Sequence, residues 1–153
     1  MGKAIVSFNS VPEMFFRLAE HYANAPQPAL SFKNKQKKTW EDISWPELRV
    51  NIEAVAAYLY HKGVRKGDRV AILSENRPEW AITDAATQLL GGINVSLYTT
   101  LPASEVAYIL KDSGSKIFLV STGIQLRKAE DVFEDCPELE EVISIAIPKK
   151  PIG

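Results

Sequence analysis

Residues 69–98 read RVAILSENRPEWAITDAATQLLGGINVSLY, two apolar runs separated by a longer stretch of mixed polarity. The runs, Arg69–Ser74 and Ile93–Tyr98, have the length and near-continuous apolar character of strands buried on both faces. Between them, Arg77–Leu90 is long enough to form a crossover helix. This strand–helix–strand unit predicts two parallel strands joined by a right-handed connection.

The alternation of strands and helices continues on both sides of this unit. Further elements are predicted as follows: helices at Val11–Tyr22, Trp45–Lys62, Pro102–Asp112 and Ile124–Asp135, and strands at Pro28–Lys33, Lys38–Ser44, Lys116–Ser121 and Val142–Ile147. The pattern predicts an α/β fold, a mostly parallel, doubly wound sheet with helices on both faces, preceded by a short N-terminal hairpin.

Three predicted helices begin with the same local pattern, a capping residue followed two and three positions later by proline and glutamate. The cap candidates are Ser10, Ser44 and Asn76. We expect each cap side chain to accept a hydrogen bond from an amide of the first turn, and the glutamate to accept one from the amide of the cap. This pattern explains much of the local sequence without a functional role.

The composition argues against electrostatic binding of nucleic acid, an intrachain disulfide and a membrane-spanning helix. The 153 residues carry a formal net charge of −1, which gives no global attraction for nucleic acid. The single cysteine, Cys136, cannot form an intrachain disulfide, and no apolar run approaches the ~20 residues of a membrane helix. A cytoplasmic location is therefore expected.

No self-sufficient catalytic or metal site is evident in the sequence. None of the predicted strands runs into a glycine-rich phosphate loop, and Gly91-Gly92 precedes a strand and fits a helix C-cap. His21 and His61 lack ligand partners at metal spacing, and Cys136 is expected to be structural. Glu75 is the one carboxylate placed directly after a predicted parallel strand.

Four segments resemble one family in their order and spacing. They are Gly63–Leu73, Asn76–Trp80, Leu97–Leu101 and Val106–Ser113. Together they resemble the AMP-forming acyl-CoA synthetases of the adenylate-forming superfamily, and in particular the long-chain fatty-acyl-CoA synthetase branch.

The resemblance implies a ligase that activates a long-chain fatty acid with ATP and Mg²⁺ to an acyl-adenylate and then transfers the acyl group to CoA. The family's phosphate loop, its ribose-binding carboxylate and its mobile lysine have no counterpart here. We therefore expect residues 1–147 to be an N-terminal subdomain of the AMP-binding domain, truncated before the phosphate loop and inactive alone. Residues 148–153 would be a connector or chain end, and the remainder of the same polypeptide a partner.

The resemblance also suggests binding residues. Thr99, Thr100, Arg127 and Lys128 are candidates for the region that holds the CoA nucleotide, and Trp80 for the border of the acyl pocket. The alternatives are that Arg127 and Lys128 are exposed helix charges and that Trp80 packs in the core. No catalytic residue and no metal ligand is assigned to the chain.

Two other functions are compatible with the sequence. A free-standing α/β binding or scaffold module without catalysis is the main alternative, and it would show no large exposed apolar face. A truncated subdomain would expose such a face and could self-associate through it. Peripheral membrane association through the Phe15-Phe16 helix is a third hypothesis, disfavoured because Arg17 is the only cation in the middle of that helix.

Overall fold

The computed structural model describes residues 6–34 and 37–145 of the chain. The end of the last predicted strand, Ala146–Ile147, and the connector 148–153 lie outside the described residues. The observed elements are α1 (Val11–His21), β1 (Leu30–Asn34), β2 (Thr39–Ile43), α2 (Trp45–His61), β3 (Arg69–Leu73), α3 (Pro78–Leu89), β4 (Ile93–Leu97), α4 (Ala103–Ser113), β5 (Ile117–Val120), α5 (Gly123–Phe133) and β6 (Glu141–Ser144).

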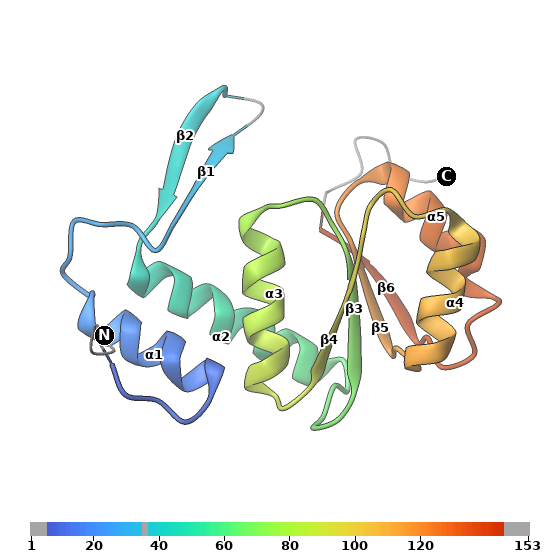
Figure 1. Cartoon of the computed structure of the whole chain (residues 1–153), viewed down its shortest axis with the longest axis horizontal. Helices are drawn as coiled ribbons and strands as arrows, with labels where there is room; N and C mark the ends of the chain where they lie inside the picture. The colour runs from blue at the N-terminus through green and yellow to red at the C-terminus, as the bar shows by residue number, and fades with distance from the viewer. Residues whose placement is uncertain (1–5, 35–36, 146–153) are drawn as a thin grey trace, which may run out of the picture.

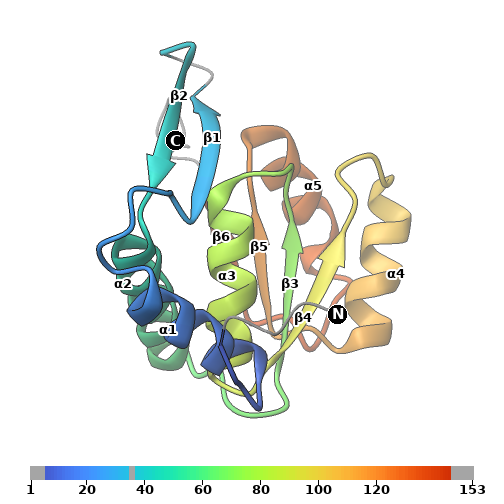
Figure 2. The ribbon, with the colours of Figure 1, turned by 60° about the vertical axis from the view of Figure 1, so that its left-hand side comes forward.

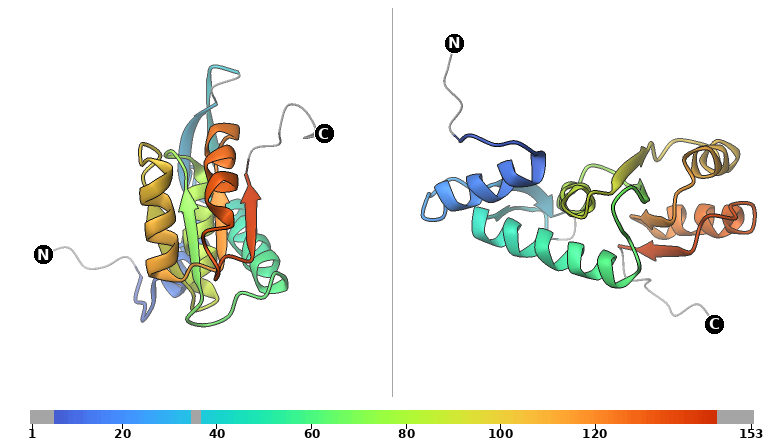
Figure 3. Two further views of the ribbon diagram at one scale, coloured as in Figure 1. Left: turned by 90° about the vertical axis from the view of Figure 1, so that its right-hand side faces the viewer. Right: turned by 90° about the horizontal axis from the view of Figure 1, so that it is seen from below.

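Four of the strands form one parallel sheet in the order β4-β3-β5-β6. Helices α2 and α3 cover one face, and α4 and α5 cover the other (Figures 1 and 3). Strands β1 and β2 pair antiparallel from Leu30↔Ile43 to Asn34↔Thr39, and this hairpin projects from the body of the molecule (Figure 2). The predicted α/β class, with a parallel sheet covered on both faces and a separate hairpin, is confirmed.

Alternate residues of β3 explain why its sequence is continuously apolar. Val70 and Ile72 pack in a core cluster with α2 and α3, whereas Ala71 and Leu73 pack in a second cluster with α4 and α5. All four are fully buried. A central parallel strand has no solvent face, so both sets of side chains must be apolar.

Two of the three predicted caps form. Ser10 and Ser44 each accept a hydrogen bond from a first-turn amide, that of Glu13 and that of Glu47, at 3.3 Å. The reciprocal bond in α1 differs from the prediction, because the Glu13 carboxylate accepts from the amide of Asn9, one residue before the cap.

The prediction for the third cap is wrong. Helix α3 begins at Pro78, its N-cap is Arg77 rather than Asn76, and Arg77 makes no side-chain capping bond. Arg77 is extended, with φ −159° and ψ 158°, as the clash with a following proline favours. Its guanidinium pairs with Glu79 instead.

The end of α3 agrees with the glycine prediction. Gly91 has φ +72°, and the amides of Gly91 and Gly92 donate to the carbonyls of Gln88 and Thr87, both at 2.9 Å. This is the paired arrangement of a Schellman motif, which glycine permits at positive φ.

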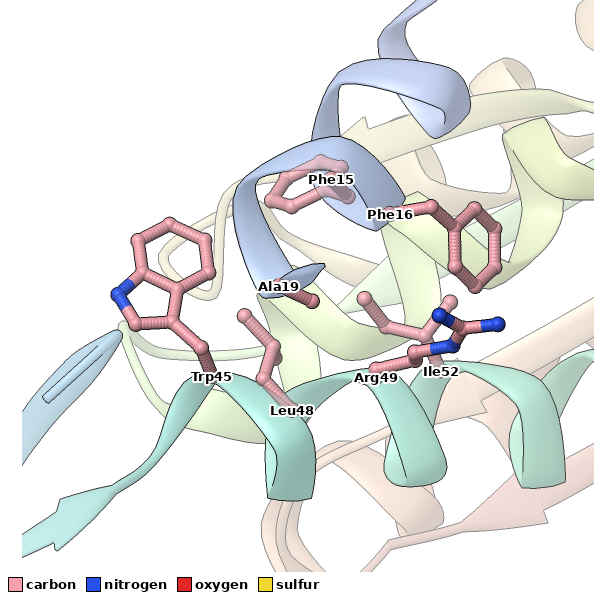
Figure 4. Close-up of a pocket in the computed structure, with 7 residues that line it drawn as sticks. All are labelled: Phe15, Phe16, Ala19, Trp45, Leu48, Arg49 and Ile52. Carbon is pink, nitrogen blue, oxygen red and sulfur yellow. The ribbon is translucent and has the colours of Figure 1, made fainter. Parts of the chain in front are cut away.

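Helix α1 packs on α2 through its aromatic face (Figure 4). Phe15 and Ala19 lie over Leu48 and Ile52, and the side chains leave no room for a water molecule between them. The Arg49 guanidinium lies 5.0 Å from the centre of the Phe16 ring, a cation–π contact. The two phenylalanines considered for membrane docking therefore take part in packing against α2.

Candidate functional site

The strand order places a topological switch beside β3. The connection from β3 to β4 leads to one side, whereas β5 lies on the other side of β3. The segments that follow β3 and β5 therefore diverge, and such a divergence is where open α/β sheets bind ligands. A hollow of about 690 Å³ lies at this point, lined by segments 75–79, 121–122 and 32–34. We call it the switch crevice.

Arg77 ties together two walls of the switch crevice. Its Nε and Nη2 donate to the two carboxylate oxygens of Glu79 at 2.7 and 2.9 Å, and its Nη1 donates to the Ser121 carbonyl at 3.2 Å. The hydrogen bond with Arg77 lowers the pKa of Glu79, and the same bond raises that of Arg77. Arg77 is thus a constitutive cation that fixes the start of α3 against the end of β5.

Glu75 lies at the carboxyl end of β3, as predicted, and forms part of the switch crevice. Its carboxylate accepts a hydrogen bond from the Ser121 hydroxyl. The crevice therefore contains both signs of charge, with Glu75 and Glu79 beside Arg77 and Lys33. This mixture provides neither a preformed anion site nor, within residues 6–34 and 37–145, a metal-binding cluster.

A second hollow, of about 510 Å³, adjoins the first at the ends of β3 and β4. Trp80 and Thr99 both line it, so two of the candidate residues from the sequence come together. Trp80 also packs partly against the α2–α3 core cluster. Thr100, the next residue along the chain, is exposed to solvent.

The two basic candidates on α5 differ in their surroundings. Lys128 is half-buried, and its Nζ donates to the carbonyls of Thr99 at 3.1 Å and Leu101 at 2.7 Å. Gln125, one turn earlier, donates to the same Thr99 carbonyl at 3.3 Å. Arg127 is exposed and has no hydrogen bond or ion pair with the described residues. Lys128 and Gln125 therefore hold the β4–α4 turn, whereas Arg127 is available to a ligand.

Sequence reasoning missed Arg77 and Gln125. Arg77 belongs to a capping pattern and to the Asn76–Trp80 segment of the family resemblance, but neither predicts its ion pair, and Gln125 gives no signal beyond its place in the first turn of α5. Both residues act on segments far away in the sequence, 44 residues distant for Arg77 and 26 for Gln125. Their partners are set by the strand order.

The remaining reactive side chains have structural surroundings. His21 and His61 are exposed in the last turns of α1 and α2. Cys136 is 4% exposed, its Sγ lies 3.9 Å from the Ala107 carbonyl oxygen, and burial raises the pKa of its thiol. The structural interpretation of Cys136 is confirmed. Among the helices that the structure describes, none has the length and apolarity needed to cross a bilayer.

Comparison with known proteins identifies the family. A family model described as "AMP-binding enzyme" matches residues 8–151. The chain belongs to the AMP-binding enzyme family. The chain is 34% identical over 134 residues to the long-chain-fatty-acid–CoA ligase ACSBG1 of Rattus norvegicus. The match covers 88% of the chain and 18% of that relative.

Other relatives agree with this assignment. The chain is 36% identical over 107 residues to the long-chain-fatty-acid–CoA ligase FadD15 of Mycobacterium tuberculosis, which covers 70% of the chain and 18% of the relative. The chain thus spans less than a fifth of the length of these curated relatives. The resemblance stated from sequence is confirmed.

Solved structures share the fold. A putative long-chain-fatty-acid CoA ligase from Rhodopseudomonas palustris superposes with a TM-score of 0.75 at 23% identity, covering 94% of this chain and 34% of that one. The adenylation domain of a carboxylate reductase from Mycobacterium chelonae superposes with a TM-score of 0.77 at 25% identity, covering 92% of this chain and 24% of that one.

Proposed function

We propose that this chain is the N-terminal part of an AMP-forming long-chain fatty-acid–CoA ligase. The complete enzyme would use ATP, Mg²⁺ and CoA to convert a long-chain fatty acid to acyl-CoA, AMP and pyrophosphate through an acyl-adenylate. The observation that carries the proposal is the match to a long-chain-fatty-acid–CoA ligase over 88% of the chain. Residues 1–147 would form the subdomain, and residues 148–153, which are not described, the connector.

The chain's own contribution in this proposal is a scaffold. Its sequence has no Ser/Thr/Gly-rich loop of the kind that grips a triphosphate with backbone amides. At the switch crevice, where such a loop would be expected in a self-sufficient domain, Arg77 is already engaged by Glu79 and Glu75 adds negative charge. With two carboxylates and two cations, the crevice offers no excess of positive charge to a triphosphate, so the 153 residues alone should not form an adenylate.

The surface at the β4–α4 turn is our proposal for contact with the CoA nucleotide. Thr99, Thr100 and Arg127 would meet the ligand, and Arg127 is suited to a phosphate because it is exposed and has no partner among the described residues. Lys128 would act as a positioning residue, since both of its bonds go to backbone carbonyls of the turn. Trp80 would border the acyl pocket, supported by its place in the hollow beside Thr99.

The proposal also includes the cellular location of the enzyme and its binding partners. A cytoplasmic location fits the single, buried and unpaired cysteine, because reducing compartments keep thiols free. The partners would be the long-chain fatty acid and the rest of the ligase polypeptide.

A chimera tests this function. In rat ACSBG1, the 134 residues that match would be replaced by the corresponding residues of this chain, and the product assayed for fatty-acid-dependent ATP–pyrophosphate exchange and acyl-CoA formation. We expect activity from the chimera and none from the 153-residue chain alone. A folded but inactive chimera, or exchange catalysed by the chain alone, would contradict the proposal.

A further inference from the structure

The two faces of the β1–β2 hairpin differ in character. The inner face is apolar and packs against the α2–α3 core cluster through Leu30, Phe32 and Ile43. The outer face consists of the exposed residues Ser31, Lys33, Trp40 and Asp42. Because the inner face alone fixes the hairpin to the body of the molecule, from which it projects (Figure 2), the outer face is not needed to hold the fold together.

Trp40 is a tryptophan for whose exposure the packing gives no reason. Its side chain is 71% exposed, whereas Trp45 and Trp80 are partly buried against the α2–α3 core cluster. Its partner across the hairpin ladder is Lys33. An indole beside a long cationic side chain suits a lipid–water interface, because the ring can enter the boundary between head groups and acyl chains while the ammonium stays in water.

Cations gather around Trp40 and toward the tip of the hairpin. Lys37 and Lys38 are exposed in the turn that leads into β2. Lys37 pairs with Glu41 at 2.8 Å, whereas Lys33 and Lys38 have no ion pair with the described residues. Residues 30–43 contain four lysines and two acidic residues, a formal charge of +2 in a chain whose total charge is −1. The hairpin is therefore a local positive region on a protein that is otherwise negative.

This layout favours an anionic membrane surface over a nucleic acid as the partner. A nucleic acid is held by a basic groove or stripe that follows its backbone, whereas the cations here are confined to one tip and Asp42 lies on the same face, farther from the turn. A bilayer needs only an aromatic side chain that enters the interface and a few lysines that meet anionic head groups. We propose that the outer face and turn of the β1–β2 hairpin dock this chain on an anionic phospholipid membrane, with Trp40 in the interface and Lys33 and Lys38 at the head groups.

The docking element differs from the α1 helix considered from the sequence, whose Phe15 and Phe16 pack against α2. Docking depends on the surface of the hairpin and goes beyond the proposed function. The proposed function gives it a use, because a long-chain fatty acid partitions into bilayers and a ligase held at the bilayer surface would meet its substrate there.

Flotation of the purified chain with lipid vesicles tests the proposal. Vesicles of phosphatidylcholine alone would be compared with vesicles of phosphatidylcholine and phosphatidylserine in equal amounts. We expect binding to the anionic vesicles that weakens at high salt, that falls about tenfold in Trp40→Ala, and that falls about fivefold in each of Lys33→Gln and Lys38→Gln. The matched controls are Tyr108→Ala and Lys111→Gln, an exposed aromatic residue and an exposed cation of α4 on the other face of the sheet, and both should bind like the wild type.

Absence of binding to the anionic vesicles would overturn the proposal, as would equal losses in the hairpin variants and the α4 controls. Binding of a duplex DNA or RNA oligonucleotide through the same hairpin residues, without vesicle binding, would identify a nucleic acid as the partner and would also overturn it.

A second measurement uses the wild-type chain and keeps the inference testable if a variant does not fold. Brominated phosphatidylcholine in the anionic vesicles should quench tryptophan emission, because Trp40 would enter the interface, and unchanged emission at saturating vesicles would overturn the proposal. An active ACSBG1 chimera that does not bind vesicles would count against this inference alone. A folded but inactive chimera that binds them would count against the proposed function alone.

Discussion

Replacement of Lys128 by methionine tests the division of roles on α5. The substitution keeps the length and apolar stem of the side chain but removes the ammonium that bonds to the Thr99 and Leu101 carbonyls at 3.1 and 2.7 Å. A hydrogen bond to a charged group contributes about 1.5–3 kcal/mol when buried. Since Lys128 is only half-buried and water can replace part of the loss, we expect the two bonds together to contribute about 2 kcal/mol.

The assay is equilibrium unfolding of the isolated chain in urea, together with thermal melting. For a domain of this size, a loss of about 2 kcal/mol corresponds to a decrease in Tm of about 4–8 °C. Amide hydrogen exchange of the turn after β4 should accelerate as well, because the hydrogen bonds from Lys128 of α5 to the carbonyls of this turn are lost.

Arg127→Met is the matched control, one residue away on the same helix. Because Arg127 is exposed and has no partner in the described part of the chain, its replacement should change stability by less than about 0.5 kcal/mol. In the active chimera, the same substitution should weaken CoA binding. The reasoning would be refuted if Lys128→Met were neutral, or if both substitutions destabilised the chain equally.

Three further predictions concern single groups. Arg77 lowers the pKa of Glu79 in the folded chain, so the charged carboxylate stabilises the fold above the ordinary value of 4.5, and this contribution is lost as the pH falls through the lowered value. Stability measured by urea unfolding should therefore fall more steeply from about pH 6 to about pH 3 in the wild type than in Glu79→Gln, and identical slopes would contradict the ion pair. Gly114 has φ +58°, and a Cβ there would lie 2.5 Å from Arg69 Nη2, so Gly114→Ala should destabilise the chain by about 1–3 kcal/mol in the same assay. The buried thiol of Cys136 should resist modification by dithionitrobenzoate in the native chain and react fully in guanidinium. Rapid modification of the native chain would contradict the burial of this thiol.

Much of the fold could be predicted from the sequence because local signals agreed with one another. The continuous apolar runs of β3 and β5 identified strands without a solvent face, and the caps at Ser10 and Ser44 fixed two helix starts. The start of α3 was missed because Asn76 fits a capping pattern, while the extended Arg77 before proline moves the N-cap one residue later.

The candidate site could be predicted only in part, because its geometry depends on strand order. That β5 pairs with β3, rather than with β4, cannot be read from apolar spacing, yet this pairing brings Ser121 to Glu75 and Arg77. Similarly, the sequence could suggest Lys128 as a phosphate ligand but not that its ammonium is occupied by the carbonyls of a turn 27 to 29 residues away.

Equilibrium binding of Mg-ATP to the purified 153-residue chain tests the central claim most directly, namely that this chain is a scaffold whose triphosphate-gripping groups lie elsewhere in the ligase. Titration calorimetry should detect no binding at micromolar to low-millimolar nucleotide, while the ACSBG1 chimera should bind. A micromolar Kd for the chain alone, abolished by substitutions in the switch crevice, would contradict the account.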